Sequence, residues 1–340
     1  MVGRKKILAM MIIISMAIVF FGCSPQESSS EGNNDLTDGE IFKIGISQLA
    51  EHAALDDARI GFIDGLEDEG FIEGENIIVD YQNAQGEIPT TQLIAQNLVS
   101  QKVDLIFAIT TPAAQSAFNV TKDIPILFTA VTDPVEAGIA ESWESSNTNA
   151  TGTSDATPIE EQFALLLELV PEAKKVGIIY NTSEVNSEIQ IKGIQDIAEK
   201  FKLEIVVSGV TNANEIPQAL DALVGKIDVL YTPTDNLIAS SMPLIVNKTS
   251  EKNIPVVGAE SAHVENGALA TDGISYYDLG FQTAKMAVEV LRGKKPAEIP
   301  ISTMEEYELL INEDSAKKLN ITIPESLKNR GKFIKGGANS

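Results

Sequence analysis

The sequence has few of the residues on which metal and thiol chemistry depend. Its 340 residues include one cysteine, Cys23, and two histidines, His52 and His263. A single cysteine cannot form a disulfide within the chain. The two histidines are far apart in sequence, and neither has a Glu or Cys nearby at the spacing of metal ligands. Metal catalysis therefore has little support, and we expect neither a metal nor another cofactor.

Several common enzyme motifs and a basic charge balance are also missing. The chain has no nucleophile elbow of the G-x-S-x-G type, no P-loop and no G-x-G-x-x-G segment. It carries 25 Lys and Arg against 49 Asp and Glu, which gives a net charge of −24. This balance disfavours nucleic acids and bare anionic membranes as partners. We expect a binding protein rather than an enzyme, and a hydrolase or isomerase is the least favoured alternative.

The N-terminal segment has the pattern of an export signal. Arg4, Lys5 and Lys6 precede an apolar run at residues 7–21, which only Ser15 interrupts. The run is shorter than the roughly 18 to 20 residues that span a bilayer, so a permanent transmembrane helix is the weaker interpretation. We predict a signal peptide at residues 1–22.

The signal peptide leads to the single cysteine. The stretch Phe20-Phe-Gly-Cys23 resembles a bacterial lipobox, in which the cysteine is acylated, although Phe20 stands where that motif usually has Leu. The residues after Cys23 are mostly Ser, Glu, Gly, Asn and Asp, which cannot bury enough surface to offset the entropy of ordering them. We therefore expect a lipidated Cys23 and a flexible tether at residues 23–40, which hold the protein at the outer face of the cell membrane.

The rest of the chain alternates short apolar runs with amphipathic stretches of helical length. This alternation predicts βαβ units and parallel sheets. The second half repeats the first, down to Lys-(Ile/Val)-Gly-Ile and Ile-Pro-(Ile/Val), which indicates an internal duplication. The expected strands are residues 42–47, 76–81, 103–108 and 124–129 in the first half, and 175–180, 203–208, 227–232 and 254–258 in the second.

The size and the duplication predict an α/β protein with two Rossmann-like lobes. About 300 residues are too many for one compact core. If each lobe takes one of the late segments, the chain crosses between lobes near residues 149–153, 259–262 and 300–303, which makes a three-stranded hinge. The expected parts are a first lobe of 41–150 plus 262–300, a second lobe of 151–260 plus 301–330, and a C-terminal tail of 331–340.

Candidate ligand-binding residues follow the expected strands, because ligands of open parallel sheets bind at the carboxyl ends of the strands. Thr111 is placed as an N-cap with Pro112 at the first helical position, and residues 130–134 repeat this arrangement before Pro134. Each helix start directs unpaired N–H groups into the cleft, which suits a carboxylate. Capping alone is the other interpretation of these residues.

The second lobe and the hinge supply acidic residues for an ammonium group. A carboxylate in a partly desolvated cleft attracts a cation more strongly than one on a wet surface. Asp235 is the first choice, with Asp155 or Glu260 as alternatives, and each could instead be a turn or cap residue. Further polar candidates are Gln48, His52, Asn83, Ser154, Asn181, Thr234 and Asn236.

Many segments of the chain resemble the TrpX-like family of ABC transporter substrate-binding proteins. The similarity extends from residue 41 to about residue 324, so chance is a poor explanation. The segments that carry it are residues 44–52, 81–85, 109–115, 124–134, 151–155, 180–181 and 233–236.

The resemblance implies a periplasmic-binding-protein type I fold, partner permease and ATPase subunits, and an aromatic amino acid, tryptophan or tyrosine, as ligand. By analogy with amino-acid binders of this fold, the ligand carboxylate would lie at Thr110, Thr111, Ala130 and Thr132, and the ammonium at Asp235. Tyr180 and one of Tyr276 or Tyr277 could flank the ring. We expect a monomer. The alternatives are a sensor that signals to a membrane receptor, and a binder of another small polar ligand.

Overall fold

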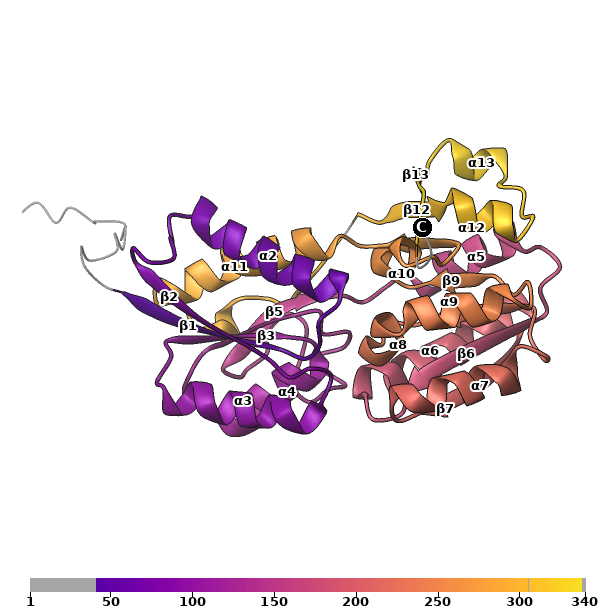
Figure 1. The fold of residues 1–340 in the computed structure, drawn as a ribbon. Helices are drawn as coiled ribbons and strands as arrows, with labels where there is room; N and C mark the ends of the chain where they lie inside the picture. The colour runs from indigo at the N-terminus through magenta and orange to yellow at the C-terminus, as the bar shows by residue number, and fades with distance from the viewer. Residues whose placement is uncertain (1–40, 305, 338–340) are drawn as a thin grey trace, which may run out of the picture. The chain divides into compact units, whose positions relative to one another are not determined.

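The structure is a computed structural model that describes residues 41–304 and 306–337 (Figure 1). The predicted signal peptide, Cys23 and the tether lie outside the described residues. In the described part of the chain, no helix is both long and apolar enough to cross a membrane.

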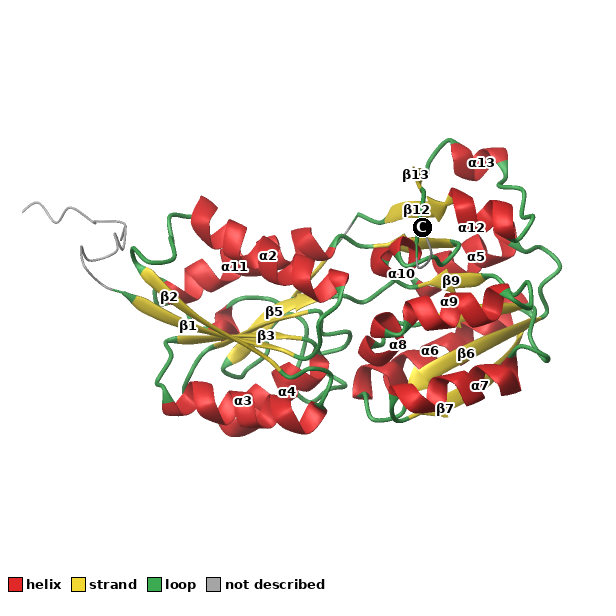
Figure 2. Ribbon diagram, viewed as in Figure 1, coloured by secondary structure: helices red, strands yellow, loops and turns green. Residues whose placement is uncertain are grey.

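The first lobe is built on a six-stranded sheet in which all paired strands are parallel. Its strand order is β11-β5-β4-β3-β1-β2. Helices α2 and α11 cover one face of the sheet, and α3 and α4 cover the other (Figures 1 and 2). The elements are β1 (Phe42–Gln48), α2 (Ala53–Asp68), β2 (Ile77–Asn83), α3 (Ile88–Ser100), β3 (Leu105–Ile109), α4 (Thr111–Val120), β4 (Ile126–Thr129), β5 (Ala150–Ser154), α11 (Tyr276–Leu291), the short 3-10 helix η2 (Pro296–Glu298) and β11 (Ser302–Thr303).

The second lobe is built on a seven-stranded sheet of order β13-β12-β10-β9-β8-β6-β7. Only the pair β10–β12 is antiparallel. The elements are α5 (Ile159–Leu169), β6 (Lys175–Asn181), α6 (Val185–Phe201), β7 (Glu204–Val210), η1 (Ala213–Glu215), α7 (Ile216–Leu223), β8 (Val229–Thr232), α8 (Asn236–Ser240), α9 (Met242–Ser250), β9 (Val256–Gly258), α10 (Ser261–Glu265), β10 (Ala270–Gly273), β12 (Glu308–Asn312), α12 (Glu313–Lys318), α13 (Glu325–Lys328) and β13 (Lys332–Ile334).

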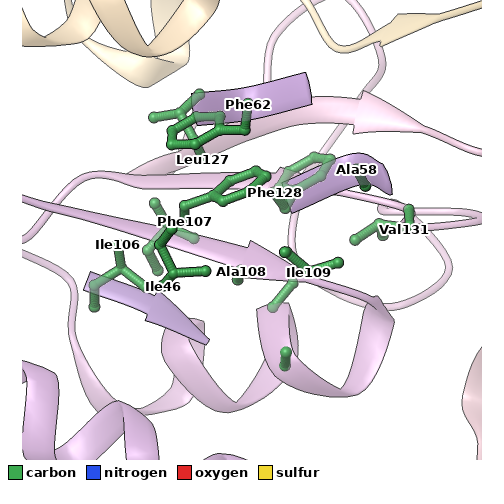
Figure 3. Packing of buried hydrophobic residues seen from close by; sticks show 14 of the residues in the cluster. Ile46, Ala58, Phe62, Ile106, Phe107, Ala108, Ile109, Leu127, Phe128 and Val131 are labelled. Carbon is green, nitrogen blue, oxygen red and sulfur yellow. The ribbon is translucent and has the colours of Figure 1, made fainter. Parts of the chain in front are cut away.

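Continuous apolar strands make the core of each lobe. Every residue of β3 is buried, as expected for a strand of a parallel sheet that is covered on both faces. Phe107 of β3 stacks on Phe62 of α2 with ring centroids 3.7 Å apart, and Phe128 of β4 lies beside this pair (Figure 3). In the second lobe, Tyr231 and Phe163 are buried and in ring contact. The expected fold class, two α/β lobes with parallel sheets, is confirmed.

The chain passes between the two sheets three times, but two crossings lie later than expected. Residues 150–154 form β5 of the first sheet, so the first crossing follows residue 154. Residues 270–273 form β10 of the second sheet, whereas we expected residues 262–300 in the first lobe. The third crossing follows β11, near the expected place. The expected C-terminal tail contains β13, which pairs with β12.

Candidate functional site

A small cavity lies where the ends of strands from both sheets meet. It borders the residues that follow β4, β5, β8 and β9, together with the first turns of α2, α6 and α11. The volume open to the centre of a water molecule is about 10 Å³, room for one water or a group of similar size. The cavity is lined by His52, Leu55, Ala130, Asp155, Asn186, Thr234, Asp235, Asn236, Glu260 and Tyr276.

Asp155 supplies a buried carboxylate that is only half used. It follows β5 and is 4% exposed. Tyr276, the first residue of α11, donates its hydroxyl to Oδ2 of Asp155 at 2.9 Å, while Oδ1 is buried and has no hydrogen-bond partner among the described residues. Burial raises the pKa of Asp155 from 3.8 to about 6, partly offset by the nearby hydroxyls of Tyr276 and Thr132, which lower it. The free oxygen can accept from a cationic group in the cavity.

Glu260 is buried at the start of α10 and faces two histidines. Its Oε1 lies 2.9 Å from Nε2 of His263, and Nδ1 of His263 lies 3.0 Å from the hydroxyl of Thr232. Burial by itself raises the pKa of Glu260, but His263, His52 and Tyr276 together lower it below the ordinary value. Glu260 is therefore an ionised group that adds negative potential to the cavity.

Both carboxylate oxygens of Asp235 accept hydrogen bonds from its own lobe. It caps α8, accepting from the backbone N–H of Ile238 at 3.0 Å, and it also accepts from the N–H of Asn181 at 2.6 Å and from Ser187 Oγ at 2.7 Å. Burial and the neighbouring Glu184 raise the pKa of Asp235. These contacts fit the interpretation of Asp235 as a helix cap better than a role in binding a ligand ammonium. The role in ammonium binding stays a prediction.

The two lobes contact each other through His52 and Asn236. Nε2 of His52, the residue before α2, lies 3.4 Å from Oδ1 of Asn236 in α8. The Nδ2 of Asn236 donates to Glu184 Oε2 at 2.5 Å, so Oδ1 is the atom that faces the imidazole. Burial lowers the pKa of His52, although Glu260 raises it, and Nδ1 of His52 has no partner in the described residues.

Asn186 lines the cavity and was missed by the sequence analysis. It is 3% exposed in the first turn of α6, and its Nδ2 donates to the carbonyl of Thr234 at 2.9 Å. Its Oδ1 is buried without a partner among the described residues. The candidate residues came from loops that follow strands, whereas Asn186 is the second residue of α6. Only a rule that included the first turn of each following helix would identify Asn186 from the sequence.

The four residues expected to hold a ligand carboxylate follow the ends of two neighbouring strands. Thr110 and Thr111 follow β3, and Ala130 and Thr132 follow β4. Thr110 rather than Thr111 caps α4: its Oγ1 accepts from the N–H of Ala113 at 3.4 Å, and the helix begins at Thr111. The hydroxyl of Thr111 is buried without a partner among the described residues. Thr110 has φ 97° and Ala130 has φ 54°, so both turns are tight.

The second expected helix start, after Thr132, is wrong. Oδ1 of Asp133 accepts from the N–H groups of Val135 and Glu136, but only a single turn follows, and it reaches Gly138 at φ 73°. A residue in this left-handed conformation ends a helical turn. The helix dipole expected at this position is therefore absent from the described segment.

The remaining candidates do not line the cavity. Gln48 donates to Ala50 and Asp56, and Asn83 donates to Tyr81 on β2, the edge strand of its sheet. Ser154 donates to the carbonyl of Thr132, and Asn181 donates its side-chain amide to Glu184. The ring of Tyr180 lies beside Gly209 of β7, and Tyr277 donates its hydroxyl to Asp64 at the surface.

A wider cavity of about 540 Å³ adjoins the small one and shares Asn236 with it. Its walls include the loops after β1 and β2 of the first lobe and the start of α8 in the second. The lining combines apolar and polar side chains: Leu49, Ala50, Glu51, Gln85, Gly86, Glu184, Ala213, Asn236, Leu237, Ser240 and Ser241. Within residues 41–304 and 306–337, no three His, Cys, Asp or Glu side chains are grouped to hold a metal.

Comparison with known proteins assigns the family. Residues 43–334 match the model of the family described as ABC transporter substrate binding protein. The chain belongs to this family. The expected resemblance is thereby confirmed, and with it the type I periplasmic-binding-protein fold. Substrate-binding proteins of ABC transporters bind small molecules outside the cytoplasm and are not enzymes.

Three related proteins are informative. A tyrosine-binding protein of Clostridioides difficile (strain R20291) is 50% identical over 324 residues, which are 94% of each chain. An ABC domain from Streptococcus pneumonia, solved in complex with L-Trp, is 35% identical with a TM-score of 0.84, covering 86% of this chain and 99% of that one. A ligand-free, open substrate-binding protein with adhesive properties from Clostridium difficile is 49% identical, with a TM-score of 0.68 and coverage of 87% and 99%.

Proposed function

We propose that this substrate-binding protein captures an aromatic amino acid, tyrosine or tryptophan, and delivers it to an ABC permease. The names of the two relatives above, a tyrosine-binding protein and a domain solved with L-Trp, support this choice of ligand. The acidic small cavity between the lobes supports a ligand with a cationic group.

The free oxygen of Asp155 is the observation that carries the proposal. A buried carboxylate oxygen without a partner is costly, and an ammonium group would satisfy it with a charge-assisted hydrogen bond. Asp155 thus takes the role for which Asp235 was the first choice. Tyr276 fixes the carboxylate of Asp155 rather than flanking a ring.

The ligand carboxylate and ring are assigned to the neighbouring surfaces. The start of α4, with the free hydroxyl of Thr111, suits a carboxylate because the first N–H groups of a helix lack intrahelical partners. The ring is assigned to the wider cavity, where Leu49 and Leu237 offer apolar contact.

The cellular setting of the proposal is an extracytoplasmic lipoprotein. Acylation of Cys23 would hold a monomer at the outer face of the cell membrane, next to a permease and its ATPase. The protein would catalyse no reaction on its ligand.

A thermal-shift screen against the twenty amino acids tests the proposed ligand class. A ligand at 100 times its dissociation constant adds about 2.7 kcal/mol to the free energy of unfolding. Tyrosine or tryptophan should give the largest rise in melting temperature. A screen in which no aromatic amino acid shifts the transition would refute the proposal.

A further inference from the structure

Three of the side chains that line the small cavity each have one buried polar atom with no partner among the described residues: Asp155 Oδ1, Asn186 Oδ1 and His52 Nδ1. Each belongs to a side chain whose other polar atom is held in place. Oδ2 of Asp155 accepts from Tyr276, Nδ2 of Asn186 donates to Thr234, and Nε2 of His52 contacts Asn236. The three free atoms therefore have fixed positions and a fixed chemical character.

All three free atoms are hydrogen-bond acceptors. The Asn186 amide cannot be flipped, because a flip would place its Oδ1 in the position now 2.9 Å from the carbonyl oxygen of Thr234, which is also an acceptor. The same reasoning applies to His52: Oδ1 of Asn236 is an acceptor, so the neutral imidazole carries its proton on Nε2 and has its lone pair on Nδ1. Asp155 Oδ1 is a carboxylate oxygen. A cavity of about one water in volume is thus bordered by three acceptors and no free donor among them.

We propose that these three acceptors form a subsite for a primary ammonium group, in which each N–H of the ligand has one partner: Asp155, His52 and Asn186. The inference rests on the proposed function and deepens it. Asp155 and His52 belong to the first lobe and Asn186 to the second, so a group with three N–H donors can satisfy all three acceptors and contact both lobes at once. The subsite selects free amino acids and excludes N-substituted ones, because the cavity has no room for a methyl group.

Calorimetric titration of the purified protein with L-tyrosine, N-methyl-L-tyrosine and 3-(4-hydroxyphenyl)propionate tests the subsite without any mutation. N-methylation removes one N–H and adds a methyl group, so affinity should fall at least about tenfold, as expected for one hydrogen bond to a charged group. The propionate lacks the ammonium and should not bind measurably. Binding of N-methyl-L-tyrosine within threefold of L-tyrosine would overturn the inference.

A pair of variants tests Asn186 itself. Asn186→Leu should weaken L-tyrosine binding about 10- to 100-fold. Gln190→Leu is the matched control, because Gln190 lies on the same helix and also donates to Thr234 but does not line the cavity. The control should bind within threefold of the original protein, with circular dichroism reporting the fold of both. Equal losses in the two variants would assign Asn186 a structural role only.

The outcomes separate the two proposals. If neither L-tyrosine nor L-tryptophan binds the unmodified protein, the proposed ligand class is wrong. If L-tyrosine binds but N-methylation and Asn186→Leu have no effect, the ligand class stands and the three-acceptor subsite does not exist.

Discussion

At the scale of single residues, the ionised carboxylate of Asp155 lowers the stability of the ligand-free protein and provides a partner for a ligand ammonium group. Its pKa is raised from 3.8 to about 6 by burial, so the folded state holds the proton more tightly than the unfolded state does. The contribution of this residue to stability therefore falls as the pH rises between about 4 and 6, and the penalty is complete at pH 7. A ligand ammonium would relieve it.

Asp155→Asn should accordingly stabilise the ligand-free protein at pH 7 and abolish binding. The neutral amide avoids the penalty, worth on the order of 1 to 3 kcal/mol because each pKa unit corresponds to about 1.4 kcal/mol. Its carbonyl oxygen can still accept from Tyr276. Thermal unfolding and calorimetric titration measure the two effects. Asp235→Asn is the contrasting variant. The pKa of Asp235 is also raised, but the amide would set its NH2 group against N–H or O–H donors that the carboxylate now satisfies, so this variant should lose stability instead. Retained binding in Asp155→Asn would contradict the assignment.

Ligand affinity should depend on pH through the same carboxyl group. As the pH falls below about 6, a proton competes with the ammonium for Asp155, so the dissociation constant should rise towards tenfold per pH unit. The groups that face Asp155 are Tyr276 and Glu260, and His52 lies in the same cavity. Protonation of His52 at low pH would remove an acceptor and act in the same direction. Titrations from pH 7.5 to 5 measure the effect, and a dissociation constant that stays flat over this range would rule it out.

At the scale of elements, close packing of α2 against α11 positions Tyr276. A Cβ on Gly280 of α11 would lie 1.9 Å from the carbonyl oxygen of Ala58, and one on Gly61 of α2 would lie 2.0 Å from that of Tyr277. These glycines let the two helices approach closely enough for the first residue of α11 to reach Asp155. The segment around Gly61 is thus a contact between two helices.

Gly280→Ala should lower the free energy of unfolding by about 2 kcal/mol or more, because the added methyl group must displace backbone. It should also weaken ligand binding by moving Tyr276. Gly193→Ala makes the same change inside α6, where the nearest atom to the new Cβ is 3.6 Å away. That control should be neutral or up to about 1 kcal/mol more stable, because Ala has the higher helix propensity. Denaturant unfolding compares the two, and equal stability of both variants would contradict the packing argument.

The sequence was most informative where strands are apolar. The eight expected runs all correspond to strands of the two sheets. The wholly buried strands β3, β4, β8 and β9 gave the clearest runs, because a strand covered on both faces must be continuously apolar. The strand β5, Ala-Thr-Gly-Thr-Ser, has no such run. It is buried through hydroxyl contacts, Thr153 with Thr129 and Thr283, and Gly152 lies close to the backbone of Phe128. A pattern search based on apolar runs could not find it, which explains the misplaced first crossing.

The sequence predicted where the candidate site lies, but not which of its carboxylates is free to bind a ligand. Strand ends identified Asp155, Glu260 and Asn236, because parallel topology alone brings those positions together. The choice between Asp155 and Asp235 depends on which carboxylate has an unused oxygen, and that is set by Tyr276 and by Ser187, which are remote in sequence. No local pattern contains this information.

At the scale of the whole molecule, the anchor and the binding site should be separable. Cys23 precedes a polar segment in the sequence, and the residues that line the two cavities all come from position 49 onward in the described part of the chain. Cys23→Ser should therefore release the protein into the medium with unchanged ligand affinity and impaired uptake. Fractionation of cells, titration of the released protein and uptake of labelled amino acid measure the three effects. A Cys23→Ser protein that stays with the membrane would exclude the lipid anchor.

Ligand binding should also change the relation between the lobes, because the proposed ammonium partners come from both sheets. Only a conformation that brings Asn186 towards Asp155 and His52 satisfies all three N–H groups, so the ligand binds that conformation with higher affinity and shifts the population to it. Small-angle scattering should show a smaller radius of gyration with saturating L-tyrosine than without ligand. Asn186→Leu, saturated with the same ligand, should show a smaller decrease, since the second lobe then loses its contact with the ammonium. An equal decrease in both proteins would place the closing contacts elsewhere in the cleft.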